Sequence, residues 1–185
     1  MPFTVVYDAD VLYPAPLRDL LLQLATTGTF RAHYTEQILD EVFRNLAADR
    51  PDLDPDRLRA TRADMETAIR GALITGHMPL VESVTLPDPD DRHVLAAAIR
   101  AGAQVIVTRN LRHYPAASLG EFDIEAQHPD VFVDHLADLA PALVVQALKA
   151  ISARLRNPPK TPAEVLATLE RSGLVQTAAR VGPLL

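Results

Sequence analysis

Apolar residues along the chain form two kinds of pattern, which predict strands and helices in alternation. Residues 3–7 are all β-branched or aromatic, as in a buried strand, and residues 30–34 suggest a short second strand. Residues 105–107, Val-Ile-Val, predict a third strand that is covered on both faces. Because strands alternate with helices, we expect parallel pairing through right-handed crossovers, and therefore a three-layer α/β/α sandwich with a central, mainly parallel sheet.

Stripes of apolar residues predict the first three helices. The first helix follows Pro14 and Pro16. Thr35 should cap the second, and Asp54 with Pro55 should begin the third. Residues 80–84 are a weak strand candidate, and residues 122–125 alternate as an edge strand would. The stripes are Leu17, Leu20, Leu21 and Leu24, then Ile38, Leu39, Val42 and Leu46, then Leu58, Met65, Ile69 and Leu73.

The stretch from residue 86 to residue 114 joins an acidic helix start to a buried strand. Asp88 should cap this helix with Pro89 at its first position, so Asp90 and Asp91 fall in the first turn, where the helix dipole favours negative charge. Residues 94–99 are too apolar for an exposed helix, and Gly102 should end it. At the carboxyl end of the following strand, where open α/β sheets bind ligands, come Thr108, Arg109 and Asn110.

The chain from Pro129 onward has helical patterns only. Thr161 to Glu164 form a capping box before one of these helices. We therefore expect an α/β domain at residues 1–128 and a C-terminal helical extension at residues 129–185 that packs on it. Asn157-Pro158-Pro159 is an alternative boundary. The apolar faces are Phe132, Val133, Leu136 and Leu139, then Val144, Leu148, Ile151 and Leu155.

Composition narrows the class of protein. The 185 residues are 48% hydrophobic, enough for a substantial core, and no apolar run approaches the ~20 residues that span a bilayer. The chain has acids near its N-terminus, where a signal peptide carries basic residues, and it has no cysteine and therefore no thiolate sites. We therefore expect a cytoplasmic protein with no membrane partner. The net charge of −6 argues against a general nucleic-acid-coating protein, although an acidic nuclease site remains compatible with it.

Carboxylates stand at several positions that a parallel sheet could bring together. Asp8 and Asp10 follow the first strand, and Asp91 begins the later helix, so Asp8 and Asp91 can converge at one sheet edge. The second helix offers Glu41 or Asp40, on opposite flanks of its apolar stripe, and spacing does not choose between them. Oxygen-rich sets of this kind suit Mg²⁺ or Mn²⁺, which can activate water. Taken singly, such acids are more often helix caps or solvated surface groups.

Three segments carry a resemblance to a known family. VVYDADVL at residues 5–12, ILDEVFRNL at 38–46 and DDRHVLAAAIRAGAQVIVTRN at 90–110 resemble the signature segments of PIN-domain ribonucleases, the fold of VapC-type toxins. The resemblance implies a Mg²⁺- or Mn²⁺-dependent endoribonuclease that hydrolyses RNA phosphodiester bonds. It also implies a cognate antitoxin protein that covers the acidic crevice, and commonly a homodimer.

The resemblance also implies roles for particular residues. Asp8, Glu41 and Asp91 would be the catalytic, metal-binding acids. Asn110 stands where the family often has a fourth acid and offers only a carbonyl oxygen, and Asp10 could partly compensate for the missing charge. His93 is expected at the surface or behind the ligands, and surface roles are expected for His33, His77, His128 and His135. The candidates for substrate binding are Thr108, Arg109, Arg112 and His113.

Two other functions start from the same residues. Asp8-Ala9-Asp10 after a strand also resembles the start of haloacid-dehalogenase-type phosphatases, in which the first Asp is a nucleophile. That chemistry needs a lysine near the phosphate, and the chain has only Lys149 and Lys160, both in the C-terminal extension. The second alternative is a catalytically weakened PIN domain that binds RNA or protein, and Asn110 is the residue that favours it.

Overall fold

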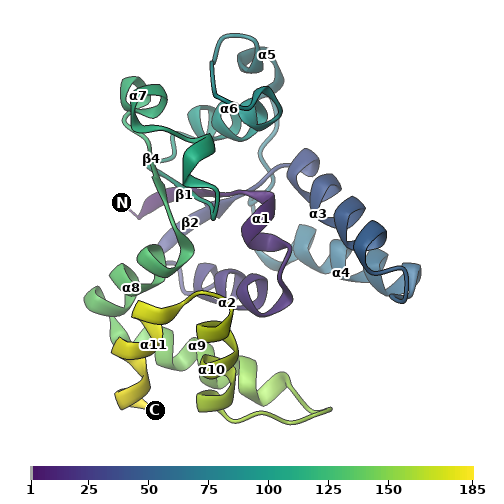
Figure 1. The fold of residues 1–185 in the computed structure, drawn as a ribbon, viewed down its shortest axis with the longest axis vertical. Helices are drawn as coiled ribbons and strands as arrows, with labels where there is room; N and C mark the ends of the chain where they lie inside the picture. Colours follow the sequence, from purple (N-terminus) through teal and green to yellow (C-terminus); the bar gives the residue numbers. More distant parts are fainter. Residues whose placement is uncertain (1) are drawn as a thin grey trace.

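A computed structural model describes residues 2–185, which form a four-stranded parallel sheet with helices on both sides (Figure 1). The predicted α/β/α fold class is therefore confirmed. The strand order is β2-β1-β3-β4, so the first strand in the sequence lies inside the sheet. All three pairings are parallel. The strands are β1 (Phe3–Tyr7), β2 (Phe30–His33), β3 (Val105–Val107) and β4 (Glu125–Gln127).

The helices follow the predicted stripes closely. Thr35 caps its helix by accepting from the backbone N–H of Ile38 at 3.1 Å, and Gly102 ends another with a φ of 61°. Before the sheet is complete the chain forms α1 (Ala9–Leu12), α2 (Ala15–Ala25), α3 (Glu36–Asp49), α4 (Pro55–Ala68), α5 (Met78–Val81), α6 (Arg92–Ala101) and α7 (Ala116–Leu119). After it come α8 (Pro129–Leu139), α9 (Pro141–Arg154), α10 (Pro162–Arg171) and α11 (Val175–Val181). The 3₁₀ turns are η1 (Pro89–Asp91), η2 (Leu111–His113), η3 (Gly120–Phe122) and η4 (Gly182–Leu184).

The sheet is covered on each face by different helices. Figure 1 shows α6 on one side of the sheet and α2 on the other. The hydroxyl of Tyr7 in β1 donates to the carbonyl of Leu21 in α2 at 3.0 Å. Phe132 of α8 packs edge-on against Phe3 and Phe30, with ring centroids 6.3 and 5.2 Å apart. One continuous core thus joins β1, β2, α2 and α8.

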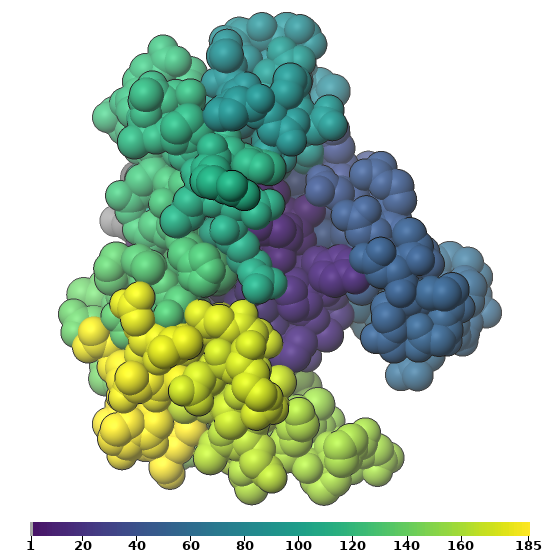
Figure 2. Space-filling model, in the orientation of Figure 1, coloured from purple at the N-terminus to yellow at the C-terminus, as the bar shows by residue number. Residues whose placement is uncertain are grey.

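The four C-terminal helices contact each other and approach the sheet through α2 and α8. The Asp130 carboxylate accepts from the backbone N–H groups of Gln176 and Thr177, each at 2.9 Å, and so fixes the start of α11. Figure 2 shows the α3–α4 pair projecting away from these helices. A pocket of about 400 Å³ lies between α2, α4 and Arg154 of α9. The proposed division at residue 128 stays a prediction, because these contacts do not separate two cores.

Four local predictions were wrong. Ile69 and Leu73 do not continue α4, because the backbone is extended at Ile69. The residues that follow pair with Tyr34, whose backbone N–H donates to the carbonyl of Ala72 at 3.0 Å. Residues 80–84 form no strand; Pro79 instead sits in the first turn of α5. The fourth strand begins only at Glu125, because Asp123 adopts a left-handed turn. Leu139 lies at the end of α8 and is 78% exposed.

No single helix among residues 2–185 is long and apolar enough to cross a membrane. Helices α8 and α9 together reach the required length and composition, but the chain bends by 117° between them.

Candidate active site

The adjacent strands β1 and β3 end side by side and place the first site residues together. Tyr7 pairs with Val107 in register, and the backbone N–H of Asp8 donates to the carbonyl of Val107 at 3.1 Å. Asp8 and Thr108 are therefore neighbours, although 100 residues separate them in sequence. This edge is where parallel sheets place their ligand crevices.

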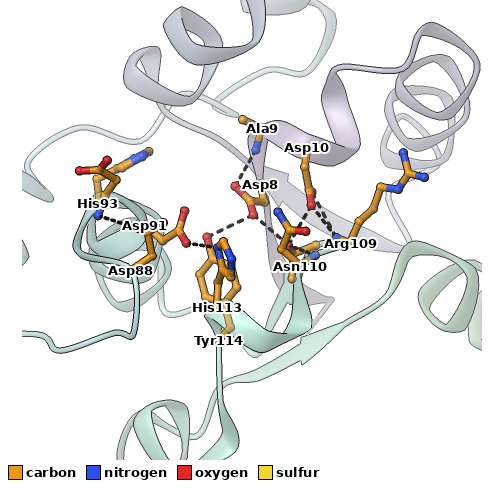
Figure 3. A network of polar contacts seen from close by, with 12 residues as sticks. Asp8, Ala9, Asp10, Asp88, Asp91, His93, Arg109, Asn110, His113 and Tyr114 are labelled. Carbon is orange, nitrogen blue, oxygen red and sulfur yellow. Dashed lines mark hydrogen bonds and ion pairs between the residues drawn. The ribbon is translucent and has the colours of Figure 1, made fainter. Parts of the chain in front are cut away.

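Asp8 is held by three hydrogen-bond donors (Figure 3). It is only 6% exposed, and it caps α1 by accepting from the N–H of Ala9 at 2.7 Å. Its Oδ2 accepts from the hydroxyls of Thr108 at 2.8 Å and Tyr114 at 3.2 Å. Burial raises the pKa of Asp8, and these donors oppose that rise by stabilising the carboxylate. Asp8 is thus a rigidly oriented carboxylate.

Asp10 lies two residues further along the chain, in the first turn of α1. Its carboxylate accepts from the backbone N–H of Arg109 at 2.9 Å and approaches the hydroxyl of Thr108 at 3.3 Å. Burial, followed by the charge of Asp8, raises the pKa of Asp10 to about 7. Asp10 therefore exchanges its proton near neutral pH.

Asp91 reaches the site from the 3₁₀ turn before α6. Its Oδ2 lies 2.7 Å from Nδ1 of His113, which belongs to η2. Burial raises the pKa of Asp91, and the contact with His113 acts in the opposite direction. Asp88 caps this turn through the N–H of Asp90, as predicted, although the α-helix proper begins only at Arg92.

Glu41 and Asp40 border the same pocket but have different partners. Asp40 pairs with Arg62 of α4 at 2.5 Å. Burial raises the pKa of Glu41, and the charges of Asp8 and Asp91 add to the rise. Nε2 of His93 lies 3.9 Å from Oε2 of Glu41. His93 is only 5% exposed, so it lies behind the acids rather than at the surface, and burial lowers its pKa to about 4.

A pocket of about 550 Å³ brings the predicted acids together. An adjoining pocket of about 690 Å³ shares Asp10, Glu41 and Asn110 with it and also contains Arg109. Thr108 is fully buried beneath the acids, and Arg112 is exposed on η2 and lines neither pocket. The first pocket is lined by Asp8, Asp10, Gln37, Asp40, Glu41, Arg44, Asp88, Asp90, Asp91, His93, Asn110 and His113.

The donor set of the first pocket suits a hard divalent cation. Burial raises the pKa values of Asp8, Asp10, Glu41 and Asp91, and neighbouring carboxylates of the pocket add to the rise, so a cation placed among them would relieve the repulsion. Among residues 2–185, the one set of three ligand groups lying within 4.8 Å of one another is Asp88, Asp91 and His113. Asp8 and Glu41 line the same pocket as Asp91 but do not belong to this 4.8 Å set.

Sequence reasoning missed several residues of this site. Tyr114 bonds to Asp8 from 106 residues away, and no local pattern signals that contact. Arg44 lies one turn beyond Glu41 on α3, so helical spacing could have indicated it. Outside the two pockets, His77 was expected at the surface but is 7% exposed, and neither of its ring nitrogens has a hydrogen-bond partner among residues 2–185.

Comparisons with known proteins agree with this geometry. A curated protein of Mycobacterium tuberculosis (strain ATCC 25618 / H37Rv), named "Putative ribonuclease VapC50", is 42% identical over 79 residues. That match covers 43% of this chain and 47% of the relative, so it spans about half the length of each. No solved structure matches the chain. A family model described as VapC50 C-terminal domain matches residues 129–183, and one described as PIN domain matches residues 4–112. Since that second match covers more than half of the chain, including the ends of β1 and β3 and the acids beside them, the chain belongs to the PIN-domain family.

Proposed function

We propose that this chain is a divalent-cation-dependent endoribonuclease. The observation that carries the proposal is the convergence of Asp8, Asp10, Glu41 and Asp91 on one pocket at the carboxyl edge of the sheet. Burial raises the pKa of all four acids, and the charges of neighbouring carboxylates add to the rise, an arrangement that costs stability unless it serves a cation. The similarity to a protein named as a ribonuclease supports RNA as the substrate.

Asp8, Glu41 and Asp91 would hold the cation, which we propose is Mg²⁺ or Mn²⁺. When bound, such an ion supplies positive charge that activates water and offsets charge on the phosphate. Thr108 orients Asp8 from beneath, and Asn110 offers a neutral oxygen at the rim of both pockets. The carboxylate of Asp10, with its pKa near 7, can accept a proton at neutral pH.

Arginines flank the acids where an RNA strand would enter and leave. Arg44 lines the first pocket, and Arg109 lines the second. Neither side chain forms an ion pair with an acid among residues 2–185, which leaves both guanidinium groups able to contact phosphate. His113 at the edge of the first pocket is a third candidate contact. We propose that the strand crosses from one pocket to the other over the acids.

The biological setting is also a proposal. We infer that the chain is the toxin of a toxin–antitoxin pair in the cytoplasm and forms a homodimer, and that a cognate antitoxin covers the acidic pocket. The matches to families described by VapC names support this setting. An antitoxin segment with a basic side chain would suit a pocket lined by this many acids.

A catalytically weakened binding module is the second candidate, and Asn110 favours it by removing one acid. The phosphatase alternative gains no support from the site. Lys149 lies in α9, and the Lys160 ammonium donates to Thr168 of α10 at 3.1 Å, so neither lysine lines the two pockets.

RNA cleavage with purified protein tests the proposal. We expect RNA to be shortened with Mg²⁺ or Mn²⁺ and to remain intact with EDTA. Asp8→Asn and Asp91→Asn should each abolish cleavage while the protein stays folded. Binding of RNA without cleavage under all metal conditions would instead support the binding module. Release of phosphate from a small monoester, with RNA left intact, would support the phosphatase.

A further inference from the structure

Tyr114 is a buried tyrosine whose hydroxyl reaches into the acidic site. Its side chain follows η2, is 2% exposed, and donates to Oδ2 of Asp8 at 3.2 Å. Tyr7 and Tyr34 are also buried, but their hydroxyls donate to the backbone carbonyls of Leu21 and Met65. The Tyr114 hydroxyl instead donates to a carboxylate that lines the pocket. This contact suggests a role in the site in addition to satisfying a buried polar group.

The hydrogen bonds of Asp8 leave one of its two oxygens more available than the other. A carboxylate oxygen offers about two acceptor positions. On Oδ2 both are taken by hydroxyl donors, Thr108 at 2.8 Å and Tyr114 at 3.2 Å. On Oδ1 the N–H of Ala9 at 2.7 Å takes one. The remaining acceptor position of Asp8 therefore lies on Oδ1.

Two consecutive residues after β3 contact two different acids (Figure 3). His113 contacts Asp91 at 2.7 Å, and Tyr114 contacts Asp8. The turn that carries them is held by its own hydrogen bonds, from the N–H of Tyr114 to Leu111 at 3.1 Å and from the N–H of His113 to Asn110 at 2.9 Å. One short turn thus ties together an acid after β1 and an acid before α6.

We propose that Tyr114 is a positioning residue that orients Asp8 so that it binds a divalent cation through Oδ1. The inference rests on the cation-dependent function proposed above. An aspartate carboxylate rotates over a broad range about its last torsion, so hydrogen bonds rather than rotamer preference must set its plane. Thr108 and the N–H of Ala9 supply one contact to each oxygen of Asp8, and the Tyr114 hydroxyl adds a second contact on Oδ2 that restricts rotation of the carboxylate further. Partners of this kind, which touch the ligand and not the metal, tune metal affinity.

Tyr114→Phe tests the inference because it keeps the buried ring and removes only the hydroxyl. Calorimetric titration of the folded, metal-free protein with Mn²⁺ should show binding weakened roughly 10-fold. Tyr34→Phe is the matched control, since it also loses a buried hydroxyl bond, to the Met65 carbonyl, at a distance from the pocket. That variant should bind Mn²⁺ like the wild type. Asp8→Asn gives the reference for loss of the ligand itself.

Metal rescue of RNA cleavage is the second readout. Cleavage by Tyr114→Phe should be low at limiting Mn²⁺ and return close to wild type at high Mn²⁺, because every group facing the substrate is retained. If Tyr114→Phe melts earlier, as Tyr34→Phe should, yet binds Mn²⁺ like the wild type, Tyr114 is structural and the inference fails while the proposed function stands. A wild-type protein that binds no Mn²⁺ and cuts no RNA overturns both.

Discussion

The hydroxyl of Thr108 donates to Oδ2 of Asp8 at 2.8 Å, and both side chains are buried. Thr108→Val should therefore keep the shape of the site but leave a buried carboxylate with one donor fewer, destabilising the fold by about 1–3 kcal/mol. RNA cleavage should fall with it, because Asp8 is less often ionised and less well oriented. Thr108→Ser keeps the hydroxyl and should retain most activity. Equal activity of the Val and Ser variants, measured on one RNA, would contradict this role.

Asp10 should make stability depend on pH in a defined direction. Its pKa is about 7 when folded, against an ordinary value of 3.8, so between these values the folded state keeps a proton that the unfolded chain has released. The contribution of Asp10 to stability is complete below about pH 3.8 and is lost as pH rises through about 7. Asp10→Asn should therefore gain stability relative to wild type as pH rises across this range.

The measurement is the melting temperature in EDTA, taken as the difference between Asp10→Asn and wild type at each pH. The difference is needed because His93 has a lowered pKa, which makes stability rise with pH. That contribution is the same in wild type and variant, so it cancels in the difference. A difference that does not change between pH 4 and 7 would show that Asp10 is not held in its protonated form.

Glu41 and Asp40 offer a matched pair of neighbouring acids. Glu41→Gln should lower kcat/KM for RNA roughly 100-fold or more, because it removes a charged ligand from the pocket. Asp40→Asn should change kcat/KM little and cost at most about 1 kcal/mol, since the Asp40 side chain is mostly exposed and already paired with Arg62. Cleavage kinetics and thermal unfolding of both variants give the comparison. If Asp40→Asn is the inactive variant, the assignment on α3 is wrong.

Asn110→Asp should restore a negative charge at the rim shared by the two pockets. We expect Mn²⁺ affinity to rise roughly tenfold, equivalent to ~1.4 kcal/mol. Asn45→Asp adds the same charge within the second pocket only and serves as the control. Calorimetry on both variants measures the effect. An equal gain for both would mean that general charge attracts the ion and that Asn110 does not face it.

Much of the fold could be predicted because its signals are local. The cap at Thr35 and the left-handed Gly102 are set by the residues themselves, and the apolar run at residues 105–107 requires a covered strand. The errors arose where a distant partner decides the conformation. Ile69 has helical spacing with Met65. The helix nevertheless ends there, because the backbone groups of Tyr34 need hydrogen-bond partners and Leu73 forms a parallel bridge with Tyr34.

The site was predictable to a similar extent, and for a similar reason. Asp8 and Asp91 follow from the rule that parallel strands end at one edge, because they flank elements that the pattern identifies. The burial of His93 and the bond from Tyr114 to Asp8 depend on how α5, α6 and η2 pack together. No periodicity carries that information, since each contact joins residues of separate elements.

The inner position of β1 in the sheet has a consequence for synthesis of the chain. Asp8 and Asp10 leave the ribosome about 100 residues before their partners Thr108, Arg109 and Tyr114. Pairing between β1 and β3 must wait for those residues, because the chain emerges from its N-terminus. A nascent chain therefore carries Asp8 and Asp10 without a formed site until about 100 further residues have been made, so the RNA cleavage proposed above could begin only after that point.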